Sequence, residues 1–180
     1  MVRKLLPSLL TVWLLLVGSQ TVCAWETIHL PPEDFLAEYL PDCEKKALWL
    51  TAEVKTRVEQ LVGRPFPGVR VRYCTAADRT GWILDEIGKT EPITTGIVVK
   101  GGQVERVRVL VFRESRGGEV HREAFVRQYE DARLNGDDAL DRHIDGITGA
   151  TLSVYALSRQ VKLALYLDEV ARQSAAKASP

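Results

Sequence analysis

The chain has 180 residues, with 24 basic against 24 acidic residues and 46% hydrophobic residues. This length and composition indicate one packed globular domain and exclude collagen-like chains, disordered chains and miniproteins dense in disulfides. A net charge of zero argues against a nucleic-acid-binding protein, because such proteins need a surplus of Lys and Arg to displace counterions from phosphates.

The first 24 residues differ from the rest of the chain. Arg3 and Lys4 precede the apolar run Leu9 to Val17 and the small-residue site Val22-Cys23-Ala24, a pattern typical of a secretory signal peptide. The apolar run is shorter than the about 20 residues that a membrane span needs. We therefore expect cleavage after residue 24 and a periplasmic protein, with an uncleaved membrane anchor as the alternative. Without this segment, 22 basic residues (24 minus 2) face 24 acidic ones, a net charge of −2.

Two cysteines remain after this cleavage, Cys43 and Cys74. In an oxidising compartment they could form a disulfide, which would stabilise the fold by roughly 3 to 4 kcal/mol through loop closure. Two buried free thiols are the alternative. The sequence contains no C-x-x-C and no H-E-x-x-H motif, so we predict no metal site.

The predicted elements begin with two helical pieces within residues 31–62. The first has a short apolar face and is closed by Pro41, and the second runs from the N-cap Thr51 to Gly63. A short extended segment at 47–50 separates them. The apolar face of the first piece consists of Phe35, Leu36, Tyr39 and Leu40.

A series of strands follows. Apolar and basic residues alternate over 69–73, the period of a half-buried strand. Further strands are predicted over 82–87, 93–100 and 104–112, and the sequence Lys-Gly-Gly-Gln between the last two predicts a hairpin turn. The short connections indicate antiparallel pairing.

A short helix over 123–134, a loop over 135–150 and a longer helix over 151–172 complete the prediction. The order of the elements predicts an α+β fold: a single domain after the signal peptide, with an antiparallel sheet of four to five strands and helices packed on one face. Residues 25–79 would form an N-terminal helical segment and first strand, residues 80–172 the core domain, and residues 173–180 a flexible tail.

One loop carries the strongest functional signal. Residues 145–151, Asp-Gly-Ile-Thr-Gly-Ala-Thr, lead small side chains directly into the first turn of the last helix. The N-terminus of a helix presents unpaired N–H groups and favours an anion, above all a phosphate. Gly149 and Ala150 permit close approach, and Thr148 and Thr151 offer hydroxyl groups. The simpler alternative is that Thr148 caps the helix and Gly149 makes a turn.

These residues resemble the D-x-x-S/T-G-A-T/S signature of the FMN-binding domain family. That family includes the G subunit of Rnf complexes, the C subunit of sodium-translocating NADH:quinone reductases and the flavin domain of nitrous-oxide regulatory membrane proteins. Residues 81–88 (GWILDEIG) also resemble the family, as do residues 114–117 (ESRG), which stand in the place of its E-T-P-G turn with Arg116 for the usual Pro. The resemblance covers roughly residues 80–165, so it assigns residues 80–172 as an FMN-binding domain core.

The resemblance implies that a flavin transferase esterifies FMN, through its phosphate, onto Thr151. Asp145 would then organise the loop or serve recognition by the transferase. Thr148 would cap the helix, and Gly149 and Ala150 would give the cofactor access.

Other residues near these motifs have two interpretations each. Glu114, Ser115 and Gly117 would either hydrogen-bond the flavin or form an ordinary turn. Trp82 would either pack on the flavin ring or lie in the core. Arg127 and Arg133 would either offset the negative charge of the phosphate or the flavin, or belong to a solvated face.

The expected function is that of a periplasmic electron-transfer flavoprotein, a carrier rather than a stand-alone enzyme, in which the flavin supplies the chemistry. It would relay electrons between redox partners such as a cytochrome or a membrane oxidoreductase, with association with a membrane as a further expectation. The alternative is a non-redox binding or assembly module, or a reversible FMN binder, in an exported or membrane-tethered complex.

Overall fold

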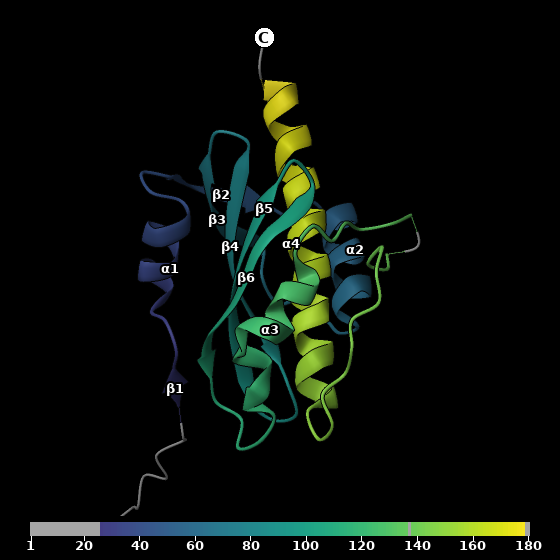
Figure 1. Ribbon diagram of the computed structural model, residues 1–180. Helices are drawn as coiled ribbons and strands as arrows, with labels where there is room; N and C mark the ends of the chain where they lie inside the picture. Colours follow the sequence, from purple (N-terminus) through teal and green to yellow (C-terminus); the bar gives the residue numbers. More distant parts are fainter. Residues whose placement is uncertain (1–25, 137, 179–180) are drawn as a thin grey trace, which may run out of the picture.

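The computed structural model describes residues 26–136 and 138–178, and the predicted signal peptide lies outside these residues. Six strands form one antiparallel sheet in the order β1-β6-β5-β4-β3-β2 (Figure 1). The strands are β1 (Thr27–Ile28), β2 (Glu44–Trp49), β3 (Arg70–Ala76), β4 (Arg79–Ile87), β5 (Pro92–Lys100) and β6 (Gln103–Phe112). The helices are α1 (Pro32–Tyr39), α2 (Ala52–Val62), α3 (Glu123–Val126) and α4 (Thr151–Ala178), with short 3-10 turns η1 (Gly118–His121) and η2 (Arg127–Tyr129).

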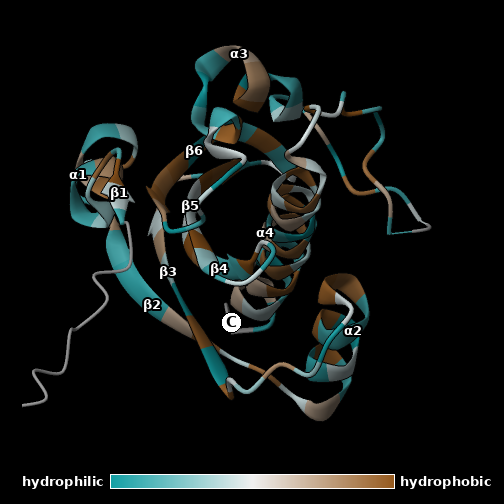
Figure 2. Ribbon diagram, turned by 90° about the horizontal axis from the view of Figure 1, so that it is seen from below, coloured by the Kyte–Doolittle hydropathy of each residue, from teal (hydrophilic) through white to brown (hydrophobic). Residues whose placement is uncertain are grey.

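The helices cover both faces of the curved sheet. The long helix α4 lies inside the curve with α2 beside it, and α1 lies outside (Figure 2). Two apolar clusters correspond to the two faces: a large one that includes Trp82 and Leu157, and a small one that includes Phe35 and Val98. The predicted α+β domain with an antiparallel sheet is confirmed.

Two details of the predicted architecture are wrong. The sheet has six strands rather than four to five, because the two-residue β1 and the mostly exposed β2 lack an apolar alternation that would reveal them. The helices do not share one face, because Phe35 and Leu40 of α1 bury against the outer face of the sheet. The predicted boundary at residue 80 falls within β4, where Thr80 pairs with Thr75 of β3, so the sheet continues across it.

Two glycines allow α1 to lie directly on the sheet. A Cβ atom on Gly81 of β4 would approach Leu40 Cδ1 to 2.8 Å, and one on Gly96 of β5 would approach the Phe35 ring to 2.6 Å. A disulfide between Cys43 and Cys74, with Cα atoms 5.6 Å apart, joins the segment after α1 to β3. The position of α1 is therefore fixed by close packing and by a covalent bond.

Buried polar contacts align α4 with the strands. Gln160 Nε2 donates to the carbonyl oxygens of Leu84 (3.2 Å) and Ile93 (2.7 Å). Near the other end of the sheet, Thr80 Oγ1 donates to Asp168 Oδ1 (2.8 Å), and the Asp168 side chain is fully buried. These contacts fix the position of α4 along its axis, and therefore the place where its N-terminus lies.

The ends of the helical segments differ from prediction. The last helix begins at Thr151 as expected but continues to Ala178, so residues 173–178 are helical rather than a tail. The predicted helix over 123–134 is reduced to α3 and η2, because the N–H of Asp131 and the carbonyl of Ala132 bond to Val104 instead of continuing a helix. Among the described residues, no helix combines the length and apolar character needed to cross a membrane.

The packing of α1 predicts the effect of adding one methyl group at Gly96. Gly96→Ala should lower the free energy of unfolding by about 1 to 3 kcal/mol, because the Phe35 ring must move out of a filled core. Urea denaturation measures this loss. The control Gly136→Ala places its Cβ in open space and should change stability by less than about 0.5 kcal/mol. Equal stability of the two variants would contradict the packing argument.

Candidate functional site

The candidate site lies at the end of the sheet where α4 begins. Three segments meet there: the first turn of α4, the turn that follows β6, and the loop between β4 and β5. They line two neighbouring pockets of about 520 and 560 Å³, which share Ser115, Arg116 and Gly149. We call them the η1 pocket, which also includes Thr148, Gly117, Gly118, Glu119, His121 and Arg122, and the α4 pocket, which also includes Lys89, Glu114, Ala150, Thr151, Leu152 and Ser153.

The start of α4 presents free donors to the α4 pocket. Gly149 has a φ of 81°, a left-handed conformation that suits glycine, and turns the chain into the helix. The first backbone hydrogen bond of the helix runs from the N–H of Val154 to the carbonyl oxygen of Ala150, at 3.0 Å. The N–H groups of the three preceding residues therefore point out of the helix end. The exposed Thr151 side chain stands at the same place, next to an end of the helix that favours anions.

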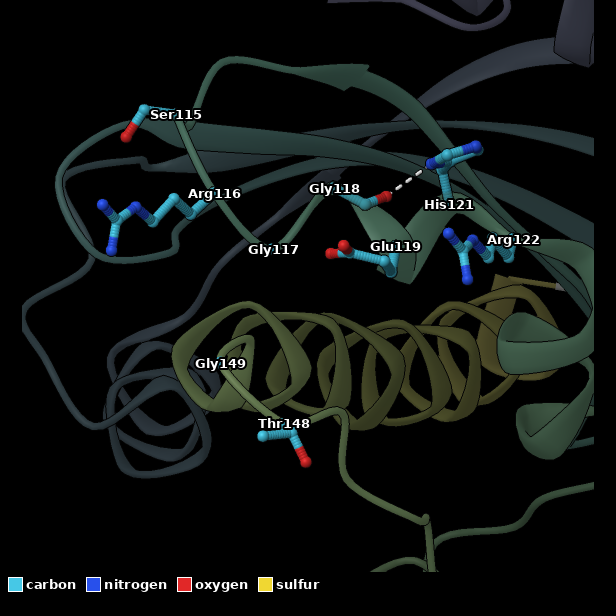
Figure 3. A pocket seen from close by; sticks show the side chains of 9 residues that line it. All are labelled: Ser115, Arg116, Gly117, Gly118, Glu119, His121, Arg122, Thr148 and Gly149. Atoms are coloured by element: carbon cyan, nitrogen blue, oxygen red, sulfur yellow. Dashed lines mark hydrogen bonds between the residues drawn. The ribbon is translucent and has the colours of Figure 1, made fainter.

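The turn after β6 packs directly on this helix end. Gly117 has a φ of 83°, and a Cβ atom there would lie 2.8 Å from Ser153 Oγ and 3.2 Å from Ala150 Cβ. Figure 3 shows this turn passing above the start of α4, with Gly149 below it, His121 at the end of η1 and Arg122 directly after it. The turn and the helix end thus form one rigid wall of both pockets.

Glu114 holds the loop between β4 and β5. Its Oε1 accepts hydrogen bonds from the backbone N–H groups of Lys89, Thr90 and Glu91, at 2.5, 2.6 and 2.9 Å. Burial raises the pKa of the Glu114 carboxyl, but these backbone hydrogen bonds outweigh burial and lower it from its ordinary value. The two carboxylate oxygens already have partners within the protein, since Oε2 accepts from Thr90 Oγ1. Glu114 therefore organises the site rather than offering a free group to a ligand.

Basic side chains line both pockets. Lys89, Arg116 and Arg122 have no ion-pair partner within residues 26–136 and 138–178, so their charge is available to an anion. Arg127, by contrast, pairs with Glu123 at 3.1 Å, and neither it nor the exposed Arg133 lines a pocket. The positive charge beside the candidate phosphate position comes from Lys89 and Arg116.

Two predicted site residues have other roles. Trp82 is fully buried in the core, stacks on Tyr73 and donates its Nε1 hydrogen to Thr80 Oγ1 at 2.9 Å, so the prediction of a flavin contact is wrong. Thr148 lines the η1 pocket, but the helix starts three residues later. Ala150 is therefore the residue before the first helical one, and the prediction of Thr148 as the helix cap is also wrong.

Asp145 lies outside both pockets, on the exposed part of the loop. Its backbone N–H donates to Gln128 Oε1 (2.7 Å), and its carboxylate is 3.6 Å from His143 Nε2. The carboxylate is 84% exposed, so another protein can reach it. The structure places Ser115, Gly117, Gly149, Ala150 and Thr151 on the lining of these two neighbouring pockets.

Several residues of the site were missed in the sequence, among them three titratable or basic ones. Lys89, His121 and Arg122 belong to segments that meet only in the folded chain, and none stands in a motif. His121 stacks on His29, with ring centroids 4.1 Å apart and an angle of 13° between the rings. Burial, and then the nearby His121, lower the pKa of His29 from its ordinary value. Only the proximity of the segments in space could have identified these three residues.

The fold and the site together define a class of protein. An α+β domain whose buried helix presents its N-terminus beside two joined pockets is suited to a cofactor that carries a phosphate. Residues 88–166 match the family described as the FMN-binding domain. The match supports flavin binding. No curated protein and no solved structure matches the chain.

The contact between Gly117 and α4 can be tested by mutation. Gly117→Ala should lower the free energy of unfolding by at least about 1 to 2 kcal/mol, because it combines an unfavourable φ with a clash against Ser153. The neighbouring Gly118→Ala is the control, since its Cβ would make an ordinary contact of 3.6 Å with Phe112. Chemical denaturation of both variants measures the difference, and a Gly117→Ala protein as stable as Gly118→Ala would argue against the rigid wall.

The lowered pKa of Glu114 predicts a dependence of stability on pH. Because its pKa is lower in the folded chain than in the unfolded one, ionised Glu114 stabilises the fold above the unfolded pKa, and this contribution is lost as the pH falls through the folded pKa. Between about pH 6 and pH 3, Glu114→Gln should therefore lose less stability than the unmodified protein. Chemical denaturation at several pH values across this range measures the free energy of unfolding of both proteins. Glu91→Gln, in the same loop, should retain the steeper dependence, and an identical slope in Glu114→Gln would contradict the assignment.

Proposed function

We propose that the protein is an exported electron-transfer flavoprotein that carries FMN bound through a phosphoester to Thr151. One observation carries the proposal: the exposed Thr151 hydroxyl stands at the N-terminus of α4, beside a basic pocket, within the FMN-binding segment. A phosphate attached there adjoins the outward N–H groups of the first helical turn. These N–H groups can donate hydrogen bonds to the oxygens of a phosphate that is esterified to Thr151.

The residues of the α4 pocket fit the phosphate. A phosphate diester retains one negative charge, which the helix N-terminus and the side chains of Lys89 and Arg116 stabilise. Gly117 holds the helix end in place, and Glu114 holds the loop that carries Lys89. These residues bind and orient the cofactor, and they take no part in bond making.

The flavin itself would extend from the α4 pocket into the η1 pocket. The two pockets meet at Ser115, Arg116 and Gly149, and the absence of a side chain on Gly149 leaves the passage open. Bound FMN supplies the electron-transfer chemistry. His121 and Arg122 place a titratable ring and a positive charge on the wall of the η1 pocket, where they act on the electrostatic environment of the cofactor.

The disulfide supports export. Disulfides persist in oxidising compartments such as the periplasm, and Cys43 and Cys74 are joined by one. Covalent attachment suits that location, because FMN made in the cytosol would otherwise be diluted away. Maturation requires a flavin transferase, and the exposed carboxylate of Asp145 is available for recognition by that enzyme. Electron transfer then requires redox partner proteins, in keeping with a carrier rather than a stand-alone enzyme.

The attachment site predicts a defined mass. The full chain, produced and processed in a host that has the transferase, should gain the mass of FMN less one water, and Thr151→Ala should abolish the gain. Thr148→Ala, three residues away in the same loop, should keep it. Intact-protein mass spectrometry with flavin absorbance measures both.

An unmodified mass in the presence of active transferase would overturn covalent attachment. If that unmodified protein bound added FMN, it would be a reversible FMN binder. If it bound none, the loop would serve a non-redox binding or assembly module. Reductive titration of the flavinylated protein then tests electron transfer, since a carrier must take up and return electrons at the bound flavin.

A further inference from the structure

The outer face of the sheet is only partly covered. Contacts at Gly81 and Gly96 place α1 over β4 and β5, and no helix of the described chain covers the outer face of β2 and β3. Cys74 pairs with Gly81, so the side chain of Cys74 shares the face on which α1 lies. The register between β2 and β3 then places three basic residues on this same face, Lys45, Arg70 and Arg72, which we call the basic strip.

The basic strip has no neutralising groups within residues 26–136 and 138–178. None of its three side chains has an ion-pair partner among the described residues. Arg70 instead lies over the ring of Trp49, 5.5 Å from its centroid, and Trp49 is 65% exposed. An exposed tryptophan beside unpaired cations is more typical of an interaction surface than of a solvated face.

A mainly apolar groove separates the basic strip from α1. It has a volume of about 680 Å³ and is open to solvent along the sheet. Its lining includes Pro32 and Leu36 of α1, Ala47 and Ile83 of the sheet, and Lys45 and Arg72 of the basic strip. The groove therefore offers an apolar floor with positive charges along one side.

The opposite charge lies on α1 itself. Phe35 and Leu40 bury one side of this helix, and Glu33, Asp34 and Glu38 are exposed. We call these three residues the acidic face. Glu33 and Asp34 have no ion-pair partner among the described residues. Glu38 forms no ion pair there either, but its negative charge helps to raise the pKa of Arg108. The carboxylates of α1 thus lie on the same outer face of the sheet as the three cations of β2 and β3.

We propose that this surface binds a second copy of the chain in a two-fold symmetric dimer. The acidic face of each α1 contacts the basic strip of the other copy, so that the two α1 helices lie side by side between the two sheets. A two-fold interface must be self-complementary, because each contact occurs twice. Opposite charges on one face of one chain satisfy this condition, whereas an unrelated acidic partner would leave the acidic face without an explanation.

The dimer leaves the candidate cofactor site open. The basic strip and α1 are on the outer face of the sheet, and α4 packs on the inner face. The inference therefore does not depend on FMN or on its attachment, and it extends the protein's properties beyond the proposed function.

Charge exchange tests the proposal without any other partner. In the first variant Lys45→Glu and Arg72→Glu make the strip acidic, and in the second Glu33→Lys and Asp34→Lys make the helix basic. Each variant alone should dissociate at least about tenfold more readily, because like charges then face each other. An equal mixture should recover the dimer, because both contacts between the two variants are attractive. Sedimentation equilibrium of the full chain, as the cell processes it, measures each dissociation constant.

A matched control changes the net charge by the same amount as the first variant, but at positions outside the proposed interface. Lys55→Glu with Lys177→Glu reverses two cations on α2 and α4 that have no ion-pair partner among the described residues, and should leave the dimer intact. Far-ultraviolet circular dichroism and thermal melting establish that each variant is folded. A monomeric protein at all concentrations, which would leave the groove to another partner, overturns the proposal. So does a dimer that both charge variants leave unchanged, or one that their mixture fails to restore.

Discussion

The structure depends on the fixed position of α4 along the inner face of the sheet. Gln160 reaches two carbonyl groups of the central strands, and Asp168 reaches Thr80. Moving the helix along its axis would leave these buried polar groups without partners, at a cost of about 1 to 3 kcal/mol for each group. The apolar face of α4 supplies most of the attraction to the sheet, but it does not by itself select one position. The polar contacts select it, and they set the place of Thr151.

The two faces of the sheet serve different purposes. On the inner face, α4 and α2 complete the main core and bring the start of α4 to the strand ends. On the outer face, α1 is held close by glycines and by the disulfide to β3, and it leaves β2 and β3 exposed. The cofactor site at the end of the sheet and the proposed dimer surface on its outer face consequently share no lining residue, so that changes at one need not disturb the other.

Much of this arrangement could be predicted from the sequence, for identifiable reasons. The alternation in β3, the Gly-Gly turn at 101–102 and the long apolar helix depend on local patterns, and both turn glycines have positive φ. The loop ending at Thr151 was recognisable because the residues of a helix N-terminus are contiguous. By contrast, β1 and the first half of β2 depend on pairing with distant strands, and only residues 47–49 of β2 fall in the extended segment predicted from the sequence.

The errors at individual residues have a common cause. Trp82 alternates with its neighbours in β4, and the sequence does not indicate whether its face meets solvent, a ligand or α4. Glu114 was placed correctly on a turn at the site, but its partners are backbone groups 23 to 25 residues away, which no motif encodes. Sequence patterns located the site, whereas the partner of each side chain was decided by long-range packing.

The position of Gly88 in the sheet has a consequence for the matched segment taken alone. The matched segment starts at the tip of the hairpin between β4 and β5, so it contains β5 but not the strand with which β5 pairs over its whole length. Taken alone, residues 88–166 would expose the buried side chains of Ile93, Ile97 and Val99 along an unpaired edge. The segment by which the family is recognised is thus not an independent folding unit. A fragment of this chain that is to fold alone must therefore begin before β4 rather than at Gly88.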